Sequence, residues 1–233
     1  IAALKAGLGK TLMERIVDSK PEVVTLLDTQ YRMNEEIMRF SSSWFYDGKV
    51  KAAPITAHRG ILDYDTPIEW VDDVANDDET VGETFVGETF GRINKVEARQ
   101  VMELLQAYFE KIGKQRILDE SIDVGIISPY RAQVQYLRHL IKKEAFFKPF
   151  RHLLSVNTVD GFQGQERDVI IVSLVRSNND GQIGFLRDLR RMNVAMTRAR
   201  SKLIIIGDHE TLAHHEFYKK LYEYIKKHKT DNF

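Results

Sequence analysis

Short apolar runs alternate with amphipathic stretches along most of the chain. In residues 94–112, apolar side chains recur every three or four positions, which predicts a helix with one buried face. The last three of six apolar runs are rich in Val and Ile and do not alternate cleanly with polar residues, as in strands covered on both faces of a sheet. The predicted strands are Val23–Leu27, Ile68–Val71, Val124–Ser128, Ser155–Thr158, Val169–Val175 and Leu203–Ile206, and the predicted helices are Glu35–Tyr46, Asn94–Ile112, Arg131–Glu144, Leu189–Arg198 and Thr211–Lys227.

The alternation of strands with helices predicts an α/β fold with a mostly parallel sheet and helices on both faces. Residues 72–91 interrupt it with an acidic segment rich in Gly and Thr, in which Val81–Phe85 is repeated as Val86–Phe90. Two copies are too few for a solenoid, so we expect a surface loop or hairpin. Ile1–Arg15 has helical character but no strand before it. We therefore expect residues 1–20 to form a linker helix from an upstream domain, and residues 21–233 to form one domain with a variable loop.

Composition narrows the class of protein only slightly. The 233 residues carry 34 basic and 34 acidic side chains. This balance neither advertises nor excludes a nucleic-acid binder, because a binding groove needs only local charge. The absence of cysteine excludes disulfides and thiolate metal sites and is typical of a reducing, cytoplasmic compartment. No apolar run approaches the roughly 18 residues of a membrane span, so we expect no membrane partner.

Chemistry-bearing residues first gather in Leu27–Met33, which reads Leu-Asp-Thr-Gln-Tyr-Arg-Met. It lies between a predicted strand and a predicted helix, where parallel sheets bind ligands. Arg32 there has the bidentate fork that suits a phosphate. A surface salt bridge is the simpler interpretation of Arg32 taken alone.

A second segment, Val159–Asp168, reads Val-Asp-Gly-Phe-Gln-Gly-Gln-Glu-Arg-Asp and joins two predicted strands. Its two glycines permit positive φ and a close approach of the backbone to a ligand. Gln163, Gln165 and Glu166 could hold a water, a ribose or an arginine. A tight turn with solvated polar residues is the alternative.

A third segment, Arg190–Arg200, carries four arginines on a predicted helix and the turn after it. Helical spacing puts Asn193, Thr197 and Arg198 on much the same face as Arg190, which suits a surface aimed at phosphates. Taken alone, most basic helical faces are simply solvated.

Four segments of the chain, taken in order, resemble motifs IV to VI of the superfamily 1 DNA and RNA helicases. They are Gln-Tyr-Arg-Met, Ser128-Pro-Tyr130, Val159–Glu166 and Asn193–Arg200. The resemblance runs from about Leu26 to Asp208 and is weak in residues 55–91. It is similar above all to the 5′-to-3′ branch that includes the nonsense-mediated-decay helicase and its immunoglobulin-switch-region relatives. It implies a second, C-terminal RecA-like motor domain with a three-layer α/β fold.

The resemblance also implies roles for single residues. Arg32 and Arg198 would touch the γ-phosphate of ATP from across a cleft, and Glu166 would lie near the ribose and the γ-phosphate. Gln30, Tyr31 and Gly164 would complete the nucleotide side, with Tyr31 near the adenine or else in the core. A separate face would hold the sugar-phosphate backbone of single-stranded DNA or RNA through Ser128, Pro129, Tyr130, Thr158, Val159, Asp160, Arg176, Ser177 and Asn178.

ATP and Mg²⁺ would be bound mainly by an N-terminal RecA-like domain of the same polypeptide, and the chain alone would not turn over ATP. The alternative is a non-catalytic module that binds single strands. Two other features are rejected. Gly9-Lys-Thr11 lacks the glycine that a phosphate loop needs five residues earlier, where Leu4 stands. The histidines at 209, 214 and 215 are interpreted as a solvated helix start, so no metal ligand is predicted.

Overall fold

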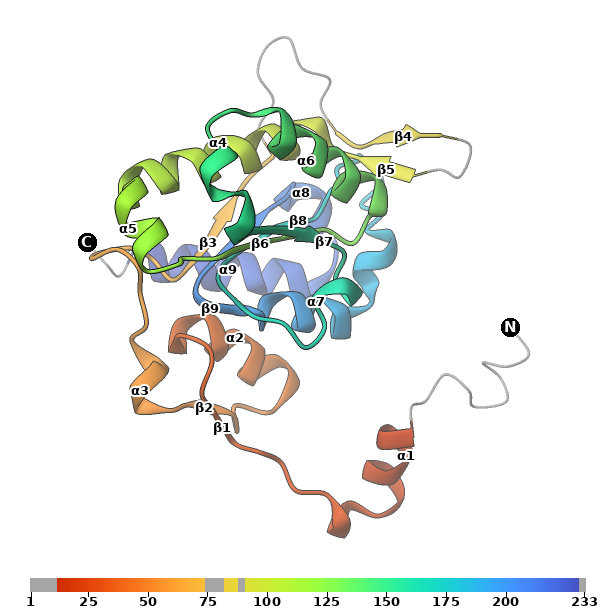
Figure 1. Cartoon of the computed structure of the whole chain (residues 1–233). Coiled ribbons are helices and arrows are strands. Elements are labelled where there is room, and N and C mark those ends of the chain that lie inside the picture. The colour runs from red at the N-terminus through yellow and green to blue at the C-terminus, as the bar shows by residue number, and fades with distance from the viewer. Residues whose placement is uncertain (1–11, 74–81, 88–90, 231–233) are drawn as a thin grey trace.

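The computed structural model describes residues 12–73, 82–87 and 91–230. Five parallel strands form its central sheet in the order β3-β9-β8-β6-β7. Figure 1 shows the labelled strands of this sheet at the centre of the domain. Their bounds are β3 (Ile68–Val71), β6 (Val124–Ile127), β7 (Leu154–Asn157), β8 (Arg167–Ser173) and β9 (Ala199–Ile206). The predicted parallel sheet is confirmed.

Helices cover both faces of this sheet, as predicted. One face packs against α2 (Glu35–Phe45), α7 (Leu189–Met196) and α9 (Glu216–Thr230), and the other against α4 (Lys95–Ile112) and α6 (Arg131–Lys143). Along β8, Ile170 and Val172 enter the first core, whereas Val169 and Ile171 enter the second. Because successive side chains of a strand point to opposite faces, the part of a central strand that is covered on both faces must be continuously apolar.

The helix boundaries follow local capping. Asn94 caps α4, since its side chain accepts a hydrogen bond from the backbone N–H of Glu97 at 3.1 Å. Asn34 caps α2 in the same way through Glu36 at 2.8 Å. The predicted helix over residues 211–227 is two helices, α8 (His209–Leu212) and α9, because Asp208 caps an earlier start and the chain turns before Glu216. Two further short helices are α3 (Pro54–Ala57) and α5 (Lys114–Asp119). Turns of 3-10 helix lie at Pro21–Val23, Lys148–Leu153, Asp160–Phe162 and Gly184–Arg187.

The predicted strand Val23–Leu27 is wrong. A 3-10 turn ends at Val23, and the residues that follow are irregular, with Leu27 84% exposed. A strand needs a neighbour for its backbone hydrogen bonds, and the chain meets one only at β1 (Thr29–Gln30), which pairs with β2 (Lys51–Ala52). The apolar run indicated a strand, but no sheet edge lies beside it.

The helix α1 (Leu12–Ser19) has no buried residue and lies apart from the sheet in Figure 1. The part of the predicted linker before Leu12, including Gly9-Lys-Thr11, lies outside the described residues. The expected loop or hairpin contains a two-stranded antiparallel hairpin, β4 (Thr84–Val86) with β5 (Gly91–Ile93). Positions 81 and 88–90 of the tandem repeat also lie outside the described residues.

Candidate nucleotide and single-strand sites

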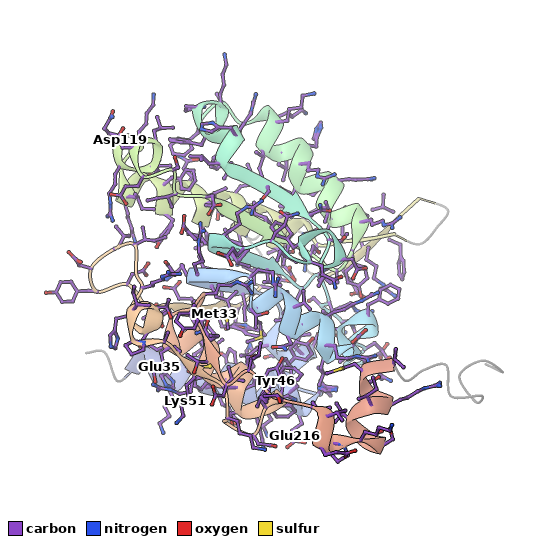
Figure 2. The ribbon with its side chains drawn as sticks, turned by 60° about the horizontal axis from the view of Figure 1, so that its bottom comes forward. Met33, Glu35, Tyr46, Lys51, Asp119 and Glu216 are labelled. Carbon is purple, nitrogen blue, oxygen red and sulfur yellow. The ribbon has the colours of Figure 1, made fainter. Side chains whose placement is uncertain are left out.

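The turn after β1 directs Arg32 toward the sheet. Gln30 Oε1 accepts hydrogen bonds from the backbone N–H groups of Arg32 (2.8 Å) and Met33 (2.7 Å), and Gln30 Nε2 donates to the Met33 carbonyl (2.9 Å). Met33 is buried where the orange N-terminal elements meet the blue C-terminal elements in Figure 2, whereas Tyr31 is 69% exposed. The side chain of Gln30 therefore shapes the turn, and Tyr31 is a surface residue rather than part of the core.

Arg32 meets both later motifs. Its Nε lies 2.5 Å from Glu166 Oε2, and its NH1 donates to the carbonyl of Thr197 at 3.0 Å. The hydrogen bond from Arg32 lowers the pKa of Glu166 below its ordinary value, against a smaller opposing effect of burial. Residues more than 130 positions apart in sequence thus form one charged site.

Arg198 joins this site from the turn after α7. Its guanidinium donates to the carbonyls of Val194 (3.0 Å) and Gln165 (3.2 Å) and to the Thr197 hydroxyl (3.1 Å). Burial and the charge of Arg32 lower the pKa of Arg198. Its three bonds go to neutral oxygens, so an incoming anion would not have to displace a carboxylate.

The expected common face of α7 does not form. The helix ends at Met196, so Arg198 leaves it. Asn193 instead contacts α2, where it accepts from Ser41 at 2.5 Å, and Arg190 pairs with Glu14 at 3.0 Å. Helical spacing misled here because α7 ends before Arg198 and because the Asn193 side chain is hydrogen-bonded to Ser41 of α2.

Two more arginines complete what we call the arginine cluster (Arg32, Arg59, Arg198 and Arg200 around Glu166). Arg200 pairs with Asp168 (2.9 Å) and Asp123 (2.8 Å) and lies 3.7 Å from Glu166. Arg59 donates to the backbone carbonyl of Arg32 at 2.9 Å. The sequence pattern contained Arg200 within the third motif, but nothing local marked Arg59.

Asn34 ties Arg59 to the same turn. Its side chain donates to the Arg59 carbonyl at 2.7 Å, and its backbone N–H donates to the Arg200 carbonyl at 2.8 Å. Gly164 lies at the rim of this region with φ +79°, and no atom lies within 4 Å of a Cβ placed there. The glycine is thus required by the backbone conformation, not by close packing.

Six of the nine residues predicted to hold a single strand follow the carboxyl ends of β6 and β7. Pro129, Thr158, Val159 and Asp160 line one pocket together with Phe185 and Arg191. Ser128 and Tyr130 are buried, and the Ser128 hydroxyl accepts from the Tyr130 N–H at 3.4 Å. Their side chains therefore support this edge from beneath and do not reach its surface.

Arg176, Ser177 and Asn178 hold loops in place. Arg176 Nε lies 2.6 Å from Glu83 Oε2, and both side chains are almost fully buried. Ser177 donates to Asp208 at 2.9 Å, and Asn178 donates to the Gln182 carbonyl at 2.9 Å. Burial raises the pKa of Glu83, against the charge of Arg176. The predicted phosphate contact of Arg176 is replaced by an ion pair that anchors the β4–β5 hairpin, which the sequence pattern did not foretell.

The described residues contain no group of three or more His, Cys, Asp and Glu side chains arranged to hold a metal ion. His209 stacks on Tyr222 and lies 2.8 Å from Asp72. No helix within the described ranges has the length and apolar character that crossing a membrane requires.

The family model for an AAA domain matches residues 8–210. Relatives extend this match over nearly the whole chain. The chain belongs to the superfamily 1 helicases, as a C-terminal RecA-like domain. An uncharacterized ATP-dependent helicase of Methanocaldococcus jannaschii is 37% identical over 94% of the chain and 32% of its own length.

Two fungal relatives also match most of the chain. The DNA polymerase alpha-associated DNA helicase A of Saccharomyces cerevisiae is 39% identical over 88% of the chain and 31% of its own length. The regulator of nonsense transcripts 1 homolog of Neurospora crassa is 34% identical over 96% of the chain and 20% of its own length. The helicase domain described here thus spans a third or less of each of these relatives.

Proposed function

We propose that this domain supplies arginines to the phosphates of ATP in a nucleic-acid-dependent helicase motor. The contact between Arg32 and Glu166, with Arg198 beside it, carries the proposal. Four guanidinium groups surround Glu166, and each is also engaged by a backbone oxygen or, for Arg200, by Asp123 and Asp168. Such a cluster fits a polyanionic ligand better than a neutral one.

The arrangement supports a role in phosphoryl transfer. Charge on the transferred group is spread over its oxygens, and preorganised guanidinium groups stabilise it without moving far. Arg198 keeps its donors on neutral oxygens, and Arg32 holds Glu166 ionised. ATP with Mg²⁺ would supply the phosphoryl group and its charge. We propose that an N-terminal RecA-like domain of the same polypeptide holds most of both.

Cleft closure between two such domains would bring Arg32 and Arg198 to the phosphates, and opening would release them. A single strand held at the carboxyl ends of β6 and β7 would then move relative to the partner domain.

The test is Arg198→Ala in the full-length protein, assayed for strand-stimulated ATP hydrolysis and for affinity to single-stranded DNA and RNA. We expect hydrolysis to fall by about a thousandfold or more, as for loss of an arginine finger. The affinity for single-stranded DNA or RNA should change by less than about twofold. Arg198 lies away from the carboxyl ends of β6 and β7, where we propose that the nucleic acid binds.

A matched control is Arg116→Ala, which removes an arginine from an exposed i,i+4 pair with Glu120 on α5. It should leave hydrolysis unchanged. Unaltered hydrolysis in Arg198→Ala would contradict the proposal. Loss of strand affinity with normal hydrolysis would favour a purely strand-binding module.

A further inference from the structure

Phe185 presents an aromatic ring to solvent from a rigid support. The ring belongs to the 3-10 turn Gly184–Arg187 and is 65% exposed, while its neighbour Leu186 is 5% exposed. The Tyr218 hydroxyl donates to the Leu186 carbonyl at 2.8 Å. Gly184 has φ +54°, and a Cβ there would lie 2.5 Å from the Arg176 guanidinium. The turn is thus fixed from below, and burial of the ring would require a partner to cover it.

The ring stands beside an apolar pocket at the functional edge of the sheet. Pro129 follows β6, Thr158 follows β7, and Leu174 follows β8, and all three line the pocket with Phe185. The Tyr130 ring lies 5.8 Å from Phe185 and supports it from the side. The carboxyl edge of a parallel sheet is where such folds bind ligands.

Arg191 at the rim of the pocket makes long, solvent-exposed ion pairs. Arg191 lies 3.5 Å from Asp160 and 3.7 Å from Asp188, and its side chain is half exposed. Solvated pairs of this length contribute little free energy, so an anion can compete for the guanidinium. The flat ring of Phe185 thus lies next to an arginine whose ion-pair partners can be replaced by another anion. This combination suits a ligand with a planar ring and a nearby anionic group.

We propose that Phe185 is a stacking platform for one base of a bound single strand, with Arg191 taking the adjacent phosphate. The proposal rests on the proposed function, and it adds a base-binding position that the sequence motifs did not contain. Any base presents a face to an aromatic ring, so the position favours no sequence. An apolar side chain of a protein partner is the competing occupant, and the experiment separates the two.

The test compares two strands of equal length and charge, one with ordinary bases and one in which every residue is abasic. Full-length protein carrying Phe185→Ala should bind the ordinary strand about 5- to 150-fold more weakly than wild type, the range that a stacked base contributes. On the abasic strand the two proteins should bind equally. Phe185→Trp should restore binding to the ordinary strand.

Tyr64→Ala is the matched control, because Tyr64 is a fully exposed aromatic outside this pocket. It should leave both affinities unchanged. Equal weakening on the two strands, or no weakening on either, would overturn the platform. Arg198→Ala distinguishes the two proposals. If this variant binds single strands normally but does not hydrolyse ATP, the motor function is retained. If Phe185→Ala then has no effect on binding, the base position is rejected. Failure of the wild-type protein to bind any strand would reject both.

Discussion

Two glutamates of this domain, Glu166 and Glu97, differ in solvent exposure, in their hydrogen-bond partners and in the direction of their pKa shift. Glu166 is 40% exposed at its side chain and contacts Arg32, which lowers its pKa. Glu97 is fully buried on α4 and accepts hydrogen bonds from the Ser173 hydroxyl (2.6 Å) and the Val175 N–H (2.7 Å). Burial raises the pKa of Glu97 well above its ordinary value, although these two bonds oppose the shift.

The difference separates Glu166, a carboxylate that contacts charged partners, from Glu97, a buried carboxyl group that stabilises the fold. Val175 has φ +71°, so the backbone after β8 needs support, and Glu97 supplies it. Glu166 touches guanidinium groups whose partners can be exchanged in water. Short contacts alone do not distinguish the two roles, since both glutamates make bonds near 2.6 Å or less. Solvent access does.

The largest expected effect on stability is at Glu97. Glu97→Ala should lower the free energy of unfolding by about 2–4 kcal/mol, because two buried donors lose their acceptor. Glu166→Ala should lower it by less than about 1 kcal/mol, since its pair with Arg32 is well solvated. Chemical denaturation of the domain measures both. Similar losses for the two variants would break the comparison.

Charge and positioning around Glu166 are tested at Arg59. Arg59→Met removes the hydrogen bond to the Arg32 carbonyl and should lower strand-stimulated hydrolysis of the full-length protein about tenfold, because small displacements of a catalytic group are costly. Arg59→Gln keeps a donor without the charge and should recover much of the rate if positioning dominates.

Arg151→Met is the control for Arg59. Arg151 also donates to a backbone carbonyl, that of Lys142 at 2.5 Å, but lies outside the arginine cluster. Its variant should match wild type. Equal rates for all three variants would remove Arg59 from the site.

The last test concerns the pH dependence of stability. Because the folded-state pKa of Glu97 lies above the unfolded value, its contribution is complete below the ordinary glutamate pKa and is lost as the pH rises toward the folded value. Glu97→Gln keeps the shape of the side chain but removes its titratable carboxyl group. The stability of this variant relative to wild type should therefore increase with pH, by at most about 1.4 kcal/mol per unit. Denaturation curves between about pH 5 and pH 8 measure the trend, and a flat or opposite trend would show that Glu97 is ionised in the fold.

The strands of the central sheet were predictable because burial on both faces demands unbroken apolar runs, such as Val169–Val172 in β8 and Leu203–Ile206 in β9. The run at Val23–Leu27 has the same composition but no neighbouring strand, and pairing partners distant in sequence are invisible to a local pattern. Arg32, Glu166 and Arg198 could be named as motif residues, but the contact of Arg32 with Glu166 could not be derived from a local pattern.

The sequence by itself determined the α/β class and the buried face of α4, because these depend on periodicity, and it identified the motif residues through their resemblance to helicase motifs. Only the tertiary structure decided which charges are exposed and which are buried. It moved Arg176 into an ion pair with Glu83, brought Arg59 to Arg32, and left Phe185 in solvent beside the predicted strand edge. Those outcomes depend on long-range packing and desolvation, which fix the energy of a charge only once its surroundings exist.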